Sequence, residues 1–126
     1  DGRTPLPDEW VEKLILDTAA AQGVNRRDIS DDEIIERTIY PMINEGAKIL
    51  EEGIAQRASD IDVVWIYGYG FPVGKGGPMH WAETVGLETI VERLDHWHGR
   101  TGNPVFEVSP LLRRLAAEGK RFKDAA

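Results

Sequence analysis

A glycine-rich stretch, residues 68–78, comes nearest to a ligand-binding motif because it holds five glycines. A dinucleotide-binding fingerprint that starts at its first glycine needs another glycine where Val73 stands, and a Walker A loop ending in its Gly-Lys pair needs one at Tyr69. Pro72 and Pro78 also remove two amide donors from any phosphate cradle. We therefore interpret this stretch as a tight aromatic-glycine turn that joins two helices.

The three histidines raise the question of a metal site. His96 and His98 are two positions apart, so on a helix they point to different sides and form a poor ligand pair. A zinc site needs further ligands at suitable positions, and the spacing around His80 supplies none. We predict no metal site and interpret the histidines as surface or partly packed residues.

Serine-type catalysis requires a base and an orienting acid beside the nucleophile. Ser30, Ser59 and Ser109 each precede a helix-like segment, where a hydroxyl serves as an N-cap. Most acidic residues lie in first helical turns or on polar faces, so their spacing does not establish a catalytic carboxylate pair. The sequence therefore predicts no catalytic, cofactor-binding or metal-binding residue.

A basic tail closes the chain, which suits the last turn of a helix. It can also attract an acidic ligand such as coenzyme A, and an acyl-CoA-binding module in its own right remains a minor alternative. The residues of this tail are Arg113, Arg114, Lys120, Arg121 and Lys123.

Composition narrows the class of protein. The net charge of −7 argues against nucleic acid as a partner, because binding phosphates needs clustered Lys and Arg. Cysteine is absent, which excludes disulfides, and no apolar run approaches the roughly 20 residues of a membrane span. The chain does not begin with methionine. We expect a piece of a larger protein, with residues 1–7 as a linker and residues 8–126 as one domain.

The apolar spacing then predicts the elements. A first helix starts at Pro7 and stops near Gly23, and a capping box at residues 30–33 opens a long helix that passes through Pro41 and ends near Gly53. Its predicted apolar face consists of Ile35, Ile39, Met42, Ile49 and Leu50.

The remaining segments contain one conflict. Residues 61–67 are β-branched and aromatic and read as a strand, whereas their spacing and the preceding Ser59 favour a helix. Further helices are predicted around residues 90–97 and from Ser109 to Gly119. With no other convincing strand, the fold class is all-α.

Taken in order, these motifs resemble the 3-hydroxyacyl-CoA dehydrogenase C-terminal domain over about residues 28–122. The resemblance implies a compact multi-helix domain of the 6-phosphogluconate dehydrogenase C-terminal-like type, with residues 61–67 helical. The pattern is most similar to the second of two such repeats in bifunctional enoyl-CoA hydratase/3-hydroxyacyl-CoA dehydrogenases. The segments that carry it are residues 31–37, 40–46, 49–53, 60–62, 68–72, 76–78, 81–86 and 110–112.

One departure from the family pattern bears on function. The family's catalytic repeat carries an Asn-Arg pair on its opening helix, and the matching pair in this chain is Glu36-Arg37. Asn44 lies about two turns further along and does not align with that asparagine. The resemblance therefore implies a non-catalytic domain without a cofactor of its own, in a fatty-acid β-oxidation enzyme that oxidises 3-hydroxyacyl-CoA with NAD.

The resemblance also implies partners and a location. We expect the domain to pack on a preceding helical repeat and a Rossmann domain that holds NAD, in a protein that takes an acyl-CoA substrate. The location expected is the cytoplasm in a bacterium and the peroxisome in a eukaryote. The alternative is a stand-alone helical oligomerisation or interaction module without enzymatic role. As an isolated chain we expect a homodimer through Ile39, Ile43, Trp65, Tyr69 and Phe71. The alternative is that these residues close the domain's own core and leave it monomeric.

Overall fold

The computed structural model describes residue 2 and residues 4–124, and within that part of the chain every regular element is a helix. The all-α prediction is therefore confirmed. Residues 1 and 3 of the expected linker, and residues 125–126 of the expected domain, lie outside the described residues. The elements are α1 (Glu9–Ala21), α2 (Asp31–Glu51), α3 (Ala58–Tyr69), η1 (Val73–Lys75), α4 (Pro78–Val85), α5 (Leu87–Thr101), η2 (Pro104–Phe106), α6 (Pro110–Glu118) and η3 (Phe122–Asp124).

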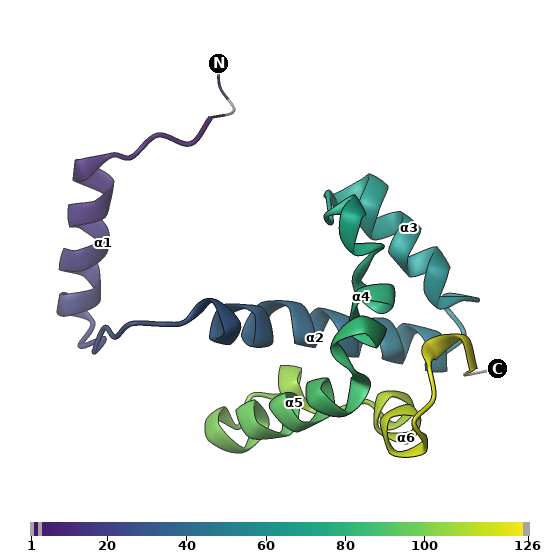
Figure 1. Ribbon diagram of the computed structural model, residues 1–126. Coiled ribbons are helices and arrows are strands. Elements are labelled where there is room, and N and C mark those ends of the chain that lie inside the picture. Colours follow the sequence, from purple (N-terminus) through teal and green to yellow (C-terminus); the bar gives the residue numbers. More distant parts are fainter. Residues whose placement is uncertain (1, 3, 125–126) are drawn as a thin grey trace.

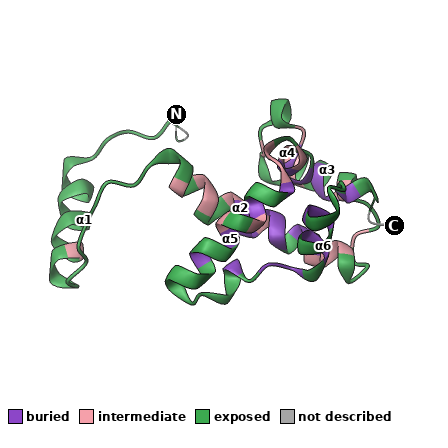
Figure 2. Cartoon of the chain, turned by 60° about the horizontal axis from the view of Figure 1, so that its bottom comes forward, coloured by how far each residue is buried: buried purple, intermediate pink, exposed green. Residues whose placement is uncertain are grey.

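Helix α2 is the centre of the packed body, and α3, α4, α5 and α6 all contact it (Figure 1). The buried residues gather where these helices meet (Figure 2). No helix of the described chain is long and apolar enough to cross a membrane. The largest completely buried apolar side chains are those of Ile43, Met79, Ile90, Leu94, Leu112 and Leu115.

Helix α1 stands apart from this body and buries no residue (Figures 1 and 2). Its start differs from the prediction: Asp8 is the N-cap and accepts hydrogen bonds from the Trp10 and Val11 amides at 2.9 and 3.1 Å, so Pro7 lies outside the helix. A carboxylate that binds these free amides stabilises a helix start better than one inside the first turn. The boundary expected between residues 7 and 8 stays a prediction.

The buried face of α2 also differs from the predicted one. The predicted apolar residues, such as Ile39 and Leu50, are only half-buried, whereas Tyr40, Ile43 and Ala47 enter the core. The stripe predicted from hydrophobicity alone is displaced because α2 is packed on several sides by α3 to α6. Pro41 lies inside the helix, as the sequence predicted, and the structure shows that it is buried.

Two of the three serines are N-caps. The Ser30 hydroxyl accepts from the Glu33 amide at 3.2 Å, and the Ser109 hydroxyl accepts from the Leu112 amide at 3.1 Å. Ser59 is not a cap, because it already lies inside α3, which begins at Ala58. The N-cap residue is Arg57, and its side chain makes no capping hydrogen bond. The helix predicted for residues 61–67 is confirmed, and tertiary packing overrides their strand-like composition.

Helix α4 was not predicted. It is short, with eight residues, and follows a glycine-rich turn, so its local signal resembles that of a loop. Met79 and Ala82 bury it against the core. Its start depends on a residue from another helix, described below.

Candidate functional site

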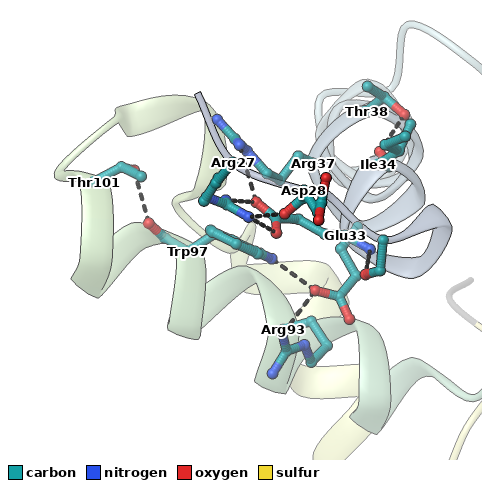
Figure 3. A network of polar contacts seen from close by, with 11 residues as sticks. Arg27, Asp28, Glu33, Ile34, Arg37, Thr38, Arg93, Trp97 and Thr101 are labelled. Atoms are coloured by element: carbon teal, nitrogen blue, oxygen red, sulfur yellow. Dashed lines mark hydrogen bonds and ion pairs between the residues drawn. The ribbon is translucent and has the colours of Figure 1, made fainter. Parts of the chain in front are cut away.

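Glu36 and Arg37, which the resemblance aligns with the family's Asn-Arg pair, lie on α2, and Glu36 faces α5. The Glu36 carboxylate accepts two hydrogen bonds at the same oxygen, Oε2, from Arg93 Nη2 and from the indole Nε1 of Trp97, both at 2.8 Å. Figure 3 shows Arg93 and Trp97 converging from α5 on this oxygen. The side chain of Glu36 is only 14% exposed. Glu36 is therefore held in place by residues about 60 positions away in the sequence.

The protonation state of Glu36 follows from these contacts. Burial raises its pKa, but the hydrogen bonds from Arg93 and Trp97 and the charge of Arg93 outweigh burial, so the pKa of Glu36 lies below its ordinary value. An ionised carboxylate only accepts hydrogen bonds, whereas an asparagine amide also donates. Glu36 therefore cannot take over the donor role of an asparagine, and its lowered pKa makes it a poor general base near neutral pH.

A second ion cluster continues the first toward the start of α2. Glu33 pairs with Arg27 from the connector between α1 and α2 (residues 22–30) and, at 3.1 Å, with Arg37 (Figure 3). The hydrogen bond from Arg27 is the main reason why the pKa of Glu33 falls to about 2. The Arg37 and Arg100 guanidinium groups lie 5.2 and 5.5 Å from the Trp97 ring, within cation–π range.

Asn44 has a structural role in this fold. It is 1% exposed, donates from Nδ2 to the Glu107 carbonyl at 2.7 Å and accepts at Oδ1 from the Ser109 amide at 2.8 Å. These bonds tie α2 to the segment before α6. The two sides of its amide group are thus occupied inside the protein. Two residues on, the Met79 side chain packs directly against Gly46, where an added Cβ would lie 2.6 Å from Met79 Sδ.

The glycine-rich turn serves the start of α4. The buried Asp62 on α3 accepts from the Met79 amide at 2.7 Å and from the His80 amide at 3.2 Å, so it supplies the cap that α4 lacks locally. Gly77, with φ of +96°, lies so close to Asp62 that any Cβ would overlap its side chain. Burial raises the pKa of Asp62 despite these backbone hydrogen bonds. The turn therefore places the backbone of Gly77 beside a carboxylate, which accounts for this glycine without a phosphate.

The basic tail is divided between ion pairs and an open pocket. Arg113 forms a bidentate pair with Asp95 at 2.7 and 2.9 Å, and Lys120 pairs with Glu118. Arg114 and Lys123 line a pocket of about 730 Å³ between the end of α2, the start of α3, and α6. Part of the predicted positive charge is therefore neutralised within the domain.

The other residues that the sequence singled out are the candidate metal ligands and the expected dimer surface. Within residues 2 and 4–124, no group of three or more His, Asp or Glu side chains could hold a metal ion. The prediction that Ile43 belongs to the dimer surface is wrong, because this side chain is fully buried in the core. Ile39, Trp65 and Phe71 are half-buried, and Tyr69 is 72% exposed.

Comparison with known proteins agrees with this architecture. Residues 34–125 match the family described as 3-hydroxyacyl-CoA dehydrogenase, C-terminal domain. The chain is 44% identical over 119 residues to the human peroxisomal bifunctional enzyme and 44% identical over 114 residues to the zebrafish (Danio rerio) one, covering 94% and 90% of this chain. It is 39% identical over 123 residues, 94% of this chain, to the Arabidopsis thaliana peroxisomal fatty acid beta-oxidation multifunctional protein MFP2.

These matches cover only a small part of each relative. The chain spans 16% of the zebrafish and human proteins and 17% of the Arabidopsis protein. The matched family residues include all of α3 to α6 and nearly all of α2, whereas α1 lies before them. The chain belongs to the 3-hydroxyacyl-CoA dehydrogenase C-terminal domain family.

Proposed function

We propose that this domain is the non-catalytic second helical repeat of an enzyme that oxidises 3-hydroxyacyl-CoA to 3-ketoacyl-CoA with NAD in fatty-acid β-oxidation. The observation that carries the proposal is the state of Glu36, whose carboxylate binds Arg93 and Trp97 at the position of the family's asparagine. An ion pair between α2 and α5 stabilises the repeat and supplies no amide donor to a substrate. Accordingly, we assign no catalytic, cofactor-binding or metal-binding residue to this domain.

The proposal places the chemistry in other domains. A Rossmann domain of the whole protein binds NAD, a preceding helical repeat supplies the asparagine to the acyl-CoA substrate, and this repeat supports that one. The names of the relatives place the eukaryotic forms in peroxisomes, and we propose the same location for a eukaryotic source and the cytoplasm for a bacterial one. An upstream Rossmann domain and Asn-Arg repeat would distinguish this proposal from a stand-alone interaction module.

Separated from its neighbours, the domain is proposed to self-associate. It exposes large apolar side chains on α1 and on the outer side of α3, among them Trp10, Val63, Val64 and Tyr67. Contiguous exposed apolar surface is uncommon on monomers and tends to find a partner. A second copy of the chain presents the same surface and can meet it through a two-fold axis.

The test is an activity and binding assay on the purified chain. With acetoacetyl-CoA and NADH, NADH absorbance should fall no faster than in a blank, and calorimetric titration with NAD should give no low-micromolar affinity. The Glu36→Asn variant should also remain inactive, because restoring the amide does not restore the NAD-binding domain. Protein-dependent NADH oxidation by the unmodified chain would contradict the proposal.

A further inference from the structure

Helix α1 carries an apolar face that stays exposed in its own chain. Trp10, Leu14 and Ile15 lie on this side of the helix and are 69%, 47% and 53% exposed. Helices this short gain most of their stability from packing an apolar face rather than from intrinsic propensity. Leu16, 51% exposed, points to the opposite side, two positions from Leu14 at about 100° per residue. The apolar stripe formed by Trp10, Leu14 and Ile15 therefore lies on one defined face of α1.

The packed body carries a groove of matching character. Two open hollows, of about 440 and 520 Å³, both lie along α2 and have Val105 of η2 as a common wall residue. We call the combined feature the α2 groove. Its α2 wall includes Ile34, Thr38, Met42 and Ile49, which recur at helical spacing, and Trp65 of α3 borders its far end.

The groove and α1 agree in length and polarity. At 1.5 Å per residue, the 13 residues of α1 extend about 20 Å, and the α2 wall from Ile34 to Ile49 extends about 22 Å. Ile34, Pro41, Met42 and Ile49 give the α2 wall an apolar row, beside the polar Arg37, Thr38 and Glu45. The ion pair of α1, Lys13 with Asp17, involves side chains that are 72% and 62% exposed. A helix laid in this groove would bury both unpartnered surfaces at once.

The attachment of the connector indicates which copy of α1 fills the groove. Arg27 is bound to Glu33, and Ile29 lines the end of the groove nearest the start of α2. The connector is therefore anchored to the body from residue 27 onward. Figure 1 shows this segment leaving the N-terminal end of α2 and holding α1 away from its own body. Without rearrangement of the connector, the groove within reach of α1 is that of another molecule.

We propose that two chains exchange α1, each helix lying in the α2 groove of the other. This inference rests on the self-association proposed above and assigns its contacts. Exchange of a terminal element is a low-cost route to a dimer, because the same packing is made twice around the two-fold axis. The apolar face of α1, not the outer face of α3, then determines the dimer.

The first test compares Leu14 and Leu16, two leucines of similar exposure on opposite sides of α1. Leu14→Gln should raise the dimer dissociation constant at least tenfold in sedimentation or light scattering, because the change removes one buried leucine in each half of the dimer. Leu16→Gln should leave that constant within about twofold. Equal effects of the two changes, or none, would overturn the exchange while leaving self-association intact. A 14.1 kDa species that persists for the unmodified chain at millimolar concentration would overturn both.

The second test distinguishes exchange from closure onto the same chain, and the absence of cysteine makes it direct. Chains carrying Leu14→Cys and chains carrying Val105→Cys, mixed under mild oxidation, should form a disulfide-linked heterodimer. A mixture of Leu16→Cys and Val105→Cys chains should form several times less. If the Leu14→Cys/Val105→Cys double variant closes instead within one monomer, α1 binds its own groove and the exchange proposal is wrong.

Discussion

Glu36 on α2 and Arg93 on α5 form an ion pair with 2.8 Å between Oε2 and Nη2, and these two residues are 57 positions apart. The same carboxylate oxygen accepts the indole hydrogen of Trp97. Arg93 Nε is buried and has no hydrogen-bond partner among the described residues, so Glu36 is the main compensation for this guanidinium. The side chain that the resemblance aligns with the family's asparagine thus joins two helices of the core.

Removing this carboxylate should destabilise the domain. Glu36→Ala leaves a partly buried guanidinium and the Trp97 indole without their acceptor, which costs about 1–3 kcal/mol in the free energy of unfolding. Urea denaturation followed by circular dichroism measures the change. Glu92→Ala, an exposed position on α5, is the matched control and should change the free energy by less than about 0.5 kcal/mol.

The contribution of Glu36 should depend on pH with a defined sign. Because its pKa in the folded protein lies below its ordinary value, its stabilisation is complete above that ordinary value, about 4.3, and is lost as the pH falls through the folded pKa. The difference in unfolding free energy between the unmodified chain and Glu36→Gln should therefore shrink between pH 6 and pH 3. A difference that stays constant over this range would show that the carboxylate charge contributes nothing.

The glycine-rich turn permits a matched pair of substitutions. Gly77→Ala forces a side chain into a backbone conformation that only glycine adopts readily, and its Cβ overlaps Asp62, so we expect a loss of at least about 2 kcal/mol. Gly74→Ala has no atom within 4 Å of the new Cβ and no positive φ, so it should be neutral or stabilising by up to about 1 kcal/mol. Thermal and urea denaturation of both variants decide the point.

Substitution of Asn44 should destabilise the domain at least as much as substitution of Glu36, although no charge is involved. Asn44→Ala removes the partners of the Glu107 carbonyl and the buried Ser109 amide, and we expect a loss of about 2–3 kcal/mol. The exposed Asn25→Ala in the connector should have little effect. If Asn44→Ala unfolds at the same urea concentration as the unmodified chain, the link between α2 and α6 carries little stability.

Local sequence signals predicted most of the helices because those helices carry their own start and stop residues. Ser30 and Ser109 bind amides within three residues, and Gly119 ends α6 in a left-handed conformation. α4 was missed because its cap comes from Asp62 on another helix, 17 residues before the Met79 amide. Ser59 was misassigned because the helix start at Ala58 has no side-chain cap to signal it.

The sequence by itself determined that the domain is helical, because residue identity and spacing are properties of the chain alone, and its resemblance to the family predicts that Glu36 stands where the catalytic repeat has an asparagine. Only the tertiary structure decided what Glu36 does. Its partners Arg93 and Trp97 lie on a different helix, and their contact depends on how α2 and α5 pack. The same is true of the buried face of α2 and of the exposed face of α1, since burial depends on which neighbours the fold places around each helix.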